Sequence, residues 1–290
     1  MFEVVGTVAS TDGVHVVVYE ERPETSGALA PVLFSHATGF HGRVFAPVAA
    51  RLAAHSRTTF DYRGYGDTAA PRDRALHWEA FGDDALAVAK HVYARHDGHP
   101  IVAAGHSMGG AGLVMAALRE PQLFAALVLF EPIIFPPESR ARAREANPLA
   151  EITRRRRRTF SDFDAVRANF AAKPPLNSLH PEALDAYVRH GFSQRDDGVH
   201  LKCDPEFEAQ TYEMGAMHDT WQRLGEMKVP TRVIAGAHAE MSPAAIAPRV
   251  AELLGNAKFV EWRDLGHFGP LEDPARFAGF IAEVGAGVAV

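Results

Sequence analysis

The chain has little of what disulfide-bonded, zinc-binding or membrane-spanning proteins need. Its 290 residues include one cysteine, Cys203, which excludes an intrachain disulfide and every cysteine-rich zinc site. No stretch reaches the ~18 consecutive apolar residues that a transmembrane helix requires. The first residues, MFEVVGTVASTDG, lack the basic start and apolar core of a secretory signal. We therefore expect a cytoplasmic protein whose cysteine thiol stays in the reduced form.

An excess of positive charge is also missing. The formal net charge is −6 and the isoelectric point is about 6.2, so nucleic acid and anionic membranes are not expected as partners. The local exception is the run of five arginines at 154–158. Because consecutive residues point all round a helix, we interpret this run as a solvated helix face and not as an anion-binding patch.

Sequence signatures of metals and nucleotides are absent as well. The chain has no H-E-x-x-H motif, and the pair His36 and His41 is weak evidence for a zinc site. The glycines near residue 107 match neither the dinucleotide-binding pattern nor the phosphate-binding loop. We expect no cofactor and no metal ion.

What the sequence does contain is a regular alternation of short apolar runs and amphipathic stretches. Two strand-like segments, EVVGTVAS and VHVVVYEE, flank a turn at residues 11–13. Further apolar runs, each followed by a turn or by helical spacing, lie at 31–40, 58–67, 101–107 and 123–132. This alternation predicts βα units on a mostly parallel sheet, where ligands bind at the carboxyl ends of the strands.

The alternation stops near Ile133 and resumes near Val229. The residues between contain helical patches but no convincing core strand. We predict a core domain made of residues 1–132 and 228–290, interrupted by a helical cap, or lid, at 133–227.

One turn carries a candidate nucleophile. Gly105-His106-Ser107-Met108-Gly109 matches G-x-S-x-G at the join of a predicted strand and a predicted helix. A serine in such a turn has a strained backbone, and its neighbours must be small where strand and helix meet. The helix that follows directs its N–H groups and its dipole at the site, which favours developing negative charge.

A serine needs a base, and His267 is the candidate. It lies in DLGHFGPLEDP, between the last predicted strand and the last predicted helix. That position suits a triad whose chain order is serine, acid, histidine.

Four motifs in this order, HATG, DYRGYGD, GHSMGG and GHFGPLEDP, resemble those of the α/β-hydrolase fold superfamily, among its members with a helical lid. The resemblance covers the whole chain. It implies an α/β fold with a mostly parallel central sheet of about eight strands flanked by helices.

The same resemblance implies an oxyanion hole and several structural residues. The oxyanion hole would use the backbone N–H groups of Met108 and Thr38, although Ala37 stands where the family has glycine. His36 would brace its loop. In DYRGYGD, the side chains of Asp61, Arg63 and Asp67 would likewise brace a turn rather than catalyse.

Two carboxylates compete for the acid of the triad. Many family members carry an aspartate where this chain has Ala239, and Glu240 follows directly. Glu131 instead ends the strand after the serine, at a position that certain lactonases and dehalogenases of the family use. Burying a carboxylate that directly follows the apolar run FAALVLF costs free energy unless the carboxylate has a partner such as imidazole. We favour Glu131 and keep Glu240 as the alternative.

These residues predict a cofactor-independent serine hydrolase that cleaves a carboxylic ester or lactone through an acyl-enzyme. Carbon–carbon bond hydrolysis and perhydrolysis use the same triad, and a non-enzymatic ligand receptor with this fold is a further alternative. A medium-sized hydrophobic substrate is expected because the predicted lid is rich in apolar side chains. These are Phe135, Phe163, Phe170, Tyr187, Phe192, Tyr212, Met214, Met217 and Trp221. The sequence does not indicate an oligomeric state.

Overall fold

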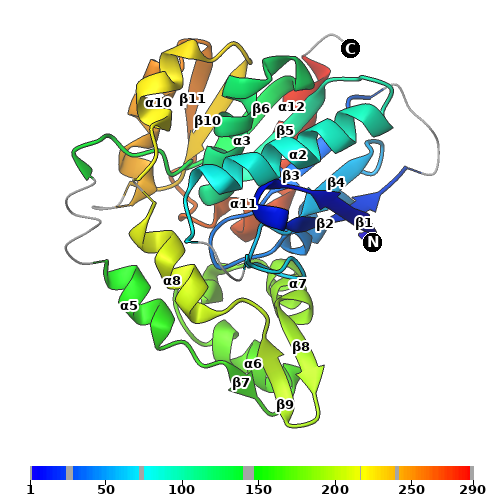
Figure 1. Cartoon of the computed structure of the whole chain (residues 1–290), viewed down its shortest axis with the longest axis vertical. Coiled ribbons are helices and arrows are strands. Elements are labelled where there is room, and N and C mark those ends of the chain that lie inside the picture. The colour runs from blue at the N-terminus through cyan, green and yellow to red at the C-terminus, as the bar shows by residue number, and fades with distance from the viewer. Residues whose placement is uncertain are drawn as a thin grey trace.

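One eight-stranded sheet organises the chain. In the computed structural model, which describes residues 2–23, 29–71, 75–139, 147–215, 217–238 and 242–287, the strand order is β1-β2-β4-β3-β5-β6-β10-β11 (Figure 1). Strand β2 is antiparallel to both of its neighbours, and every other pair is parallel. The strands are β1 (Glu3–Ala9), β2 (His15–Glu21), β3 (Val32–Ser35), β4 (Arg57–Phe60), β5 (Ile101–His106), β6 (Phe124–Phe130), β10 (Thr231–Ala235) and β11 (Ala257–Glu261). The predicted fold class is confirmed.

Helices cover both faces of this sheet because its central strands are apolar on both sides. In β6, Leu127 and Leu129 join one buried cluster, whereas Val128 and Phe130 join the other, as the two-residue period of a strand requires. The first cluster also takes residues from α2 (Glu79–Arg95), α3 (Met108–Arg119) and α10 (Ala247–Leu253). The second takes residues from α1 (Ala46–Ala50), α11 (Gly269–Glu272) and α12 (Pro274–Ala286).

The described part of the segment between β6 and β10 contributes no strand to the main sheet, and most of it lies at the bottom of Figure 1. Its helices are α5 (Pro148–Arg154), α6 (Phe163–Ala171), α7 (Pro181–Gly191), α8 (Pro205–Glu213) and α9 (Thr220–Arg223). It also forms a small antiparallel sheet of β7 (Thr159–Phe160), β9 (Gly198–Leu201) and β8 (Phe192–Arg195). We refer to residues 147–227 as the cap segment.

The expectation of a wholly helical insertion is therefore wrong in this detail. Strands β8 and β9 pair across a two-residue turn in which Arg195 faces Gly198. Gly198 has φ +133 and lies against the carbonyl of Phe160, so a side chain there would block the third strand. The Asp197-Gly198 pair is a known hairpin signal in sequences, which the helical patterns on either side concealed.

The cap segment rests on loops that follow strands of the main sheet. The Phe40 ring, in the loop after β3, lies 5.4 Å from the ring of Tyr187 on α7. The ammonium of Lys202 lies 2.6 Å from the Asp67 carboxylate, in the loop after β4. The cap segment thus packs over the carboxyl ends of the strands, where the ligand of a parallel α/β sheet is expected.

The arginine run differs from its predicted role. Only Arg154 belongs to α5, and the other four arginines connect it to β7. Arg154 pairs with Glu206 and Glu213 on α8. Arg156 turns inward to the fully buried Glu208, with 2.7 Å between nitrogen and oxygen. The run is therefore not one solvated helix face, because its members have separate partners: Arg154 and Arg156 form ion pairs, and Arg157 lies over the ring of Phe160.

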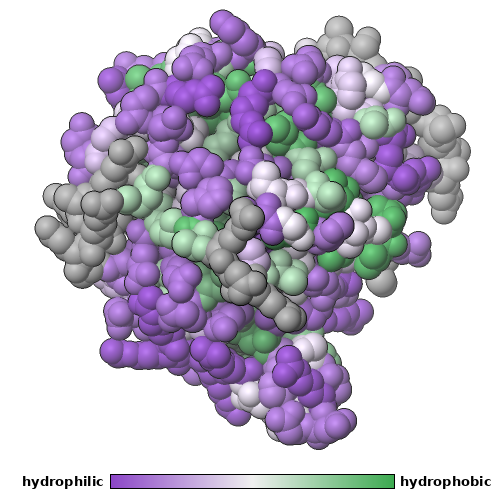
Figure 2. Space-filling view, viewed as in Figure 1, coloured by the Kyte–Doolittle hydropathy of each residue, from purple (hydrophilic) through white to green (hydrophobic). Residues whose placement is uncertain are grey.

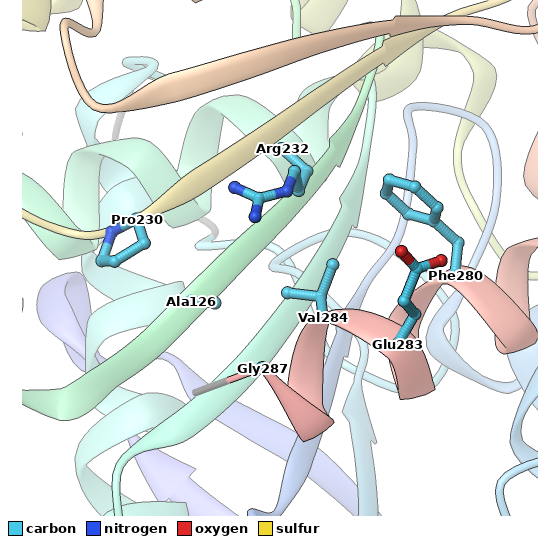
Figure 3. A pocket seen from close by; sticks show the side chains of 7 residues that line it. All are labelled: Ala126, Pro230, Arg232, Phe280, Glu283, Val284 and Gly287. Carbon is cyan, nitrogen blue, oxygen red and sulfur yellow. The ribbon is translucent and has the colours of Figure 1, made fainter. Parts of the chain in front are cut away.

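The surface also has pockets to which the cap segment contributes no residue. A pocket of about 200 Å³ lies at the amino ends of β6 and β10, where Arg232, Phe280 and Glu283 line it (Figure 3). The face of the molecule in Figure 2 is mostly hydrophilic, with apolar residues in small groups. Across the described ranges, no helix is long and apolar enough to cross a membrane.

Candidate active site

Ser107 occupies the sharp turn between β5 and α3. Its backbone has φ +54 and ψ −116, a conformation that non-glycine residues rarely adopt. The Ser107 N–H donates to the carbonyl of Phe130 at 2.9 Å, and the Ser107 carbonyl accepts from the N–H of Ile133 at 3.3 Å. The strained turn is thus held by backbone bonds to the end of β6. Ser107 is 5% exposed.

Two glycines make this turn possible. A Cβ on Gly105 would lie 2.8 Å from the backbone nitrogen of Gly110, and one on Gly109 would overlap the carbonyl of Ser35 at the end of β3. The Ser35 hydroxyl also donates to the carbonyl of Gly109 at 3.0 Å. Strand β3 and helix α3 therefore touch through backbone atoms, as the predicted turn demands.

His267 and Glu131 lie in direct contact. The Nδ1 atom of His267 is 2.6 Å from Oε2 of Glu131, and Oε1 accepts from the N–H of Gly236 at 2.8 Å. The carboxylate of Glu131 is 1% exposed, whereas the imidazole of His267 is 29% exposed. Both oxygens of a buried carboxylate are thereby paired, which is the condition under which such a group is tolerated inside a protein.

This contact fixes the tautomer of His267. A carboxylate only accepts hydrogen bonds, so Nδ1 carries the proton, and Nε2 of the neutral ring has a free lone pair. A histidine in this state is able to take a proton from a hydroxyl group.

The backbone of Glu131 is unusual as well. Its φ of +44 is in the left-handed region, and its N–H donates to the carbonyl of Ile234 on the neighbouring strand β10 at 2.8 Å. Glu131 therefore sits between the ends of β6 and β10, one strand away from Ser107. The other candidate acid, Glu240, lies outside the described residues.

The loop after β3 lies against the serine turn. His36 is fully buried, its Nδ1 bonds the carbonyl of Ala37 at 2.8 Å, and its Nε2 accepts from the N–H of Tyr62 at 3.0 Å. Burial lowers the pKa of His36 to about 4, so the ring is neutral near pH 7. Its bonds are those of the structural brace predicted for it.

The two predicted oxyanion donors lie in the two segments that meet here, one in the serine turn and one in the loop after β3. Met108 is the first residue of α3, so its N–H has no partner within the helix. Thr38 is 6% exposed, and its hydroxyl has no hydrogen-bond partner among the described residues. The serine turn and the loop after β3 adjoin, since a Cβ on Gly109 would overlap the backbone of Ser35 and His36. An oxyanion hole built from the Met108 and Thr38 N–H groups stays a prediction.

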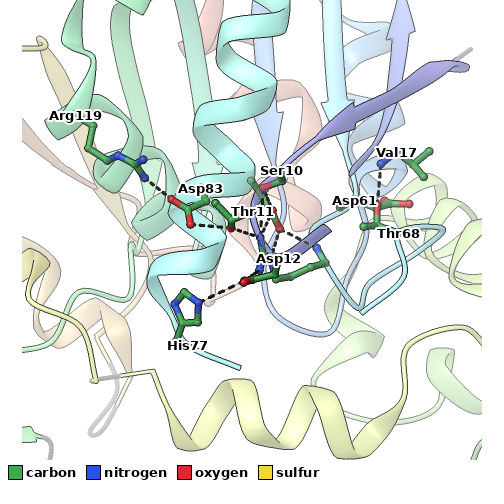
Figure 4. Close-up of polar contacts among 11 residues, drawn as sticks. Ser10, Thr11, Asp12, Val17, Asp61, Thr68, His77, Asp83 and Arg119 are labelled. Atoms are coloured by element: carbon green, nitrogen blue, oxygen red, sulfur yellow. Dashed lines mark hydrogen bonds and ion pairs between the residues drawn. The ribbon is translucent and has the colours of Figure 1, made fainter. Parts of the chain in front are cut away.

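The acidic and basic residues of DYRGYGD have structural partners. The Asp61 carboxylate is 1% exposed and accepts from the N–H groups of Gly42 and Asp67, both at 2.7 Å. Arg63 binds Asp84 at 2.7 Å and Asp12 at 2.9 Å, within a network that ties the turn between β1 and β2 to α2 (Figure 4). The predicted bracing role fits these contacts.

One contact at the site was not predicted from the sequence. The Nε2 atom of His106, in the middle of the G-x-S-x-G turn, lies 2.7 Å from the backbone carbonyl of His267. Nothing in the local sequence indicates that these two residues meet, because they are joined only by tertiary structure. No group of three or more potential metal ligands was found in the described part of the chain.

Comparisons with known proteins agree with this architecture. A family model described as "Alpha/beta hydrolase family" matches residues 32–280. The 2-(acetamidomethylene)succinate hydrolase of Mesorhizobium japonicum is 26% identical over 233 residues, which cover 80% of this chain and 78% of that protein.

Two solved structures share the fold. The crystal structure of E-2-(acetamidomethylene)succinate hydrolase superposes with a TM-score of 0.78 at 21% identity, covering 98% of this chain and 99% of the other. The enol-lactonase from Burkholderia xenovorans LB400 superposes with a TM-score of 0.67 at 21% identity, covering 96% and 98%. Since the family model spans most of the sequence, the chain belongs to the alpha/beta hydrolase family.

Proposed function

We propose that this protein is a cofactor-independent serine hydrolase that cleaves a carboxylic ester or lactone with Ser107, His267 and Glu131. The observation that carries the proposal is the 2.6 Å contact between His267 Nδ1 and Glu131 Oε2. The backbone of His267 also bonds His106, the residue directly before Ser107, whose φ is +54. A buried carboxylate that orients an imidazole next to a strained serine turn is the arrangement needed to activate a hydroxyl nucleophile.

The chemistry follows from the positions of the donors and acceptors. His267 Nε2 takes the proton of Ser107 while the hydroxyl oxygen attacks the carbonyl carbon. The N–H groups of Met108 and Thr38 bind the resulting oxyanion. The protonated imidazole then gives its proton to the leaving alcohol, and Glu131 stabilises the imidazolium without taking the proton itself. Water activated by the same histidine releases the acid.

Two relatives support acyl chemistry of this kind. One is named for hydrolysis of 2-(acetamidomethylene)succinate, and a structural neighbour is named an enol-lactonase. A serine nucleophile argues against the epoxide hydrolases and haloalkane dehalogenases of this fold, which need a carboxylate in its place. Carbon–carbon bond hydrolysis and perhydrolysis by the same triad, and a ligand receptor without turnover, are the alternatives that the experiments must separate.

A medium-sized hydrophobic substrate remains part of the proposal, but fewer side chains support it than the sequence suggested. Tyr187 and Phe192 are each 2% exposed and pack within the cap segment and against the core. Phe135, Met214 and Trp221 are only partly buried, as are Phe163 and Phe170. A hydrolysis screen across acyl-chain lengths and lactone ring sizes would define the substrate.

The first test uses a fluorophosphonate probe, which labels activated serines. We expect the wild-type protein to be labelled and Ser107→Ala to lose both labelling and ester hydrolysis. Ser139→Ala, in the segment that follows β6, is the control and should keep both. If the folded wild-type protein neither reacts with the probe nor hydrolyses any ester, the result would contradict the proposed hydrolase function and favour a ligand receptor.

The second test identifies the acid. Glu131→Gln keeps an acceptor for the N–H of Gly236 but removes the charge that stabilises the imidazolium. We expect kcat to fall by about 10³ to 10⁴ in Glu131→Gln, by comparison with the loss found when the acid of a serine protease is replaced by its amide. Glu240→Gln should stay within about threefold of wild type. The reverse pattern would assign the acid to Glu240.

A further inference from the structure

His106 is a buried polar side chain that the proposed mechanism leaves without a role. It occupies the first variable position of G-x-S-x-G and is 1% exposed. Its Nε2 lies 2.7 Å from the carbonyl oxygen of His267, and the two imidazole rings are 4.9 Å apart. The residue before the nucleophile therefore contacts the residue that supplies the base.

The direction of this hydrogen bond is determined by its partner. A carbonyl oxygen only accepts, so Nε2 of His106 carries the proton and Nδ1 does not. The rings of Phe130 and Phe268 lie 5.9 Å and 6.0 Å from that of His106, which makes its surroundings apolar. Burial and the nearby His267 hold the pKa of His106 well below its usual range, so it remains a neutral donor.

We propose that His106 is a positioning residue for the base: its Nε2–H holds the backbone of His267 and so aligns the imidazole with Ser107. The inference rests on the proposed function. His267 is then fixed at two points, its carbonyl by His106 and its ring Nδ1 by Glu131. Ser107 is covalently bonded to His106, so nucleophile and base share one anchor.

The electrostatic environment of this anchor suits the proposed reaction. Among the described residues, the titratable groups around the two rings are Glu131, which bonds His267, and His36, whose ring is neutral near pH 7. A neutral donor at position 106 adds no positive charge beside the imidazolium that forms on His267 during catalysis. A lysine or arginine would also donate to the carbonyl, but its charge would oppose that imidazolium.

The magnitude of the effect follows from the geometry. Movement of a catalytic group by ~1 Å can reduce the rate about 100-fold. Loss of the His106 bond leaves the Glu131 contact in place and frees only the loop backbone. We therefore expect kcat to fall about 10- to 100-fold, with little change in KM, because His106 touches the base and not the substrate.

The experiment compares three substitutions at position 106, assayed with a p-nitrophenyl ester. His106→Leu removes the donor, His106→Gln offers an amide N–H that can reach the same carbonyl, and His106→Asn carries the same group on a shorter side chain. We expect His106→Leu and His106→Asn to show the full loss of kcat and His106→Gln to recover to within about threefold of wild type. The downfield ¹H NMR signal of the His267 Nδ1 proton should broaden in the first two variants and return in the third.

His99→Leu is the matched control. His99 also bonds a backbone carbonyl through a ring nitrogen, that of His96 at 2.7 Å, but it lies exposed on the surface. Its activity should equal that of wild type. Full activity in His106→Leu, or an equal loss in His106→Leu and His106→Gln when both are folded, would overturn the inference. If His106→Leu does not fold, the difference in kcat between His106→Gln and His106→Asn tests the inference by itself. Failure of the proposed function is distinguishable, because the wild-type protein would then show no hydrolysis at all.

Discussion

At the scale of single residues, the candidate site depends on polar side chains whose hydrogen bonds are completed inside the fold. Both carboxylate oxygens of Glu131 accept hydrogen bonds. Both ring nitrogens of His36 are also hydrogen-bonded, one as donor and one as acceptor. Such groups are stable in the interior only in one protonation state, because a change of charge would leave a desolvated ion without a suitable partner. The stability of the protein should therefore depend on pH.

His36 gives a specific prediction of this kind. Its pKa is about 4 in the folded protein, against 6.5 in the unfolded chain, so between these values only the unfolded chain binds the proton. The neutral form stabilises the fold fully above pH 6.5, and that stability is lost as the pH falls toward 4. The contribution amounts to about 3 kcal/mol.

We expect His36→Gln to reduce the fall in unfolding free energy between pH 7 and pH 4.5, measured by urea denaturation. The dependence should weaken and not vanish, because burial also lowers the pKa of His41 and His106. Parallel curves for wild type and His36→Gln would show that His36 does not contribute.

At the scale of secondary-structure elements, the join of β5 and α3 depends on close backbone contact. Gly109 lies in the first turn of α3, where a Cβ would overlap the carbonyl of Ser35. The same helix is held against β3 by the Ser35 hydroxyl. Neither β3 nor α3 can move aside to admit a Cβ, since both are buried elements and they meet through backbone atoms.

Two glycine substitutions test this point. Gly109→Ala should lower the unfolding free energy by about 2 kcal/mol or more and abolish reaction with the fluorophosphonate probe, because the turn must open to admit the methyl group. Gly279→Ala is the matched control, since Gly279 lies on the exposed face of α12 with open space around it. There alanine should raise stability by about 0.5–1 kcal/mol through its helix propensity. Equal effects of the two changes on thermal unfolding would contradict this explanation.

At the scale of the whole molecule, the cap segment is joined to the core through aromatic packing, hydrogen bonds and ion pairs. The Tyr187 ring packs against Phe40 and Phe170, each 5.4 Å away, while its hydroxyl has no hydrogen-bond partner among the described residues. The ion pair between Lys202 and Asp67 also crosses the boundary, but both side chains are partly exposed. Exposed pairs of this kind contribute only about 0–1 kcal/mol.

Substitutions at Tyr187 separate the contribution of its ring from that of its hydroxyl. Tyr187→Phe should leave the unfolding free energy unchanged or raise it, because it removes a buried hydroxyl that lacks a partner and keeps the ring. Tyr187→Ala should lower it by about 3–5 kcal/mol, the usual cost of removing a buried aromatic ring. Urea denaturation at pH 7 measures both. A large loss in Tyr187→Phe would instead indicate that the hydroxyl has a partner in solution.

The sequence by itself determined those features that depend on local chemistry and on order along the chain. Alternating apolar runs predicted the sheet and its flanking helices, because two-residue and 3.6-residue periods are properties of the local backbone. The glycines around Ser107 predicted the strained turn, because no larger residue fits there. Burial after an apolar strand pointed to Glu131 as a paired carboxylate.

Only the tertiary structure decided which distant residues meet. It brought His267 to Glu131 and to His106, directed Arg156 inward to Glu208, and added the β7-β9-β8 sheet to the cap segment. Apart from the hairpin of β8 and β9, these contacts have no local signal, because they join residues far apart in the chain. They form because burial of the apolar faces brings the strand ends together, and polar groups must then find partners in the dry interior that results.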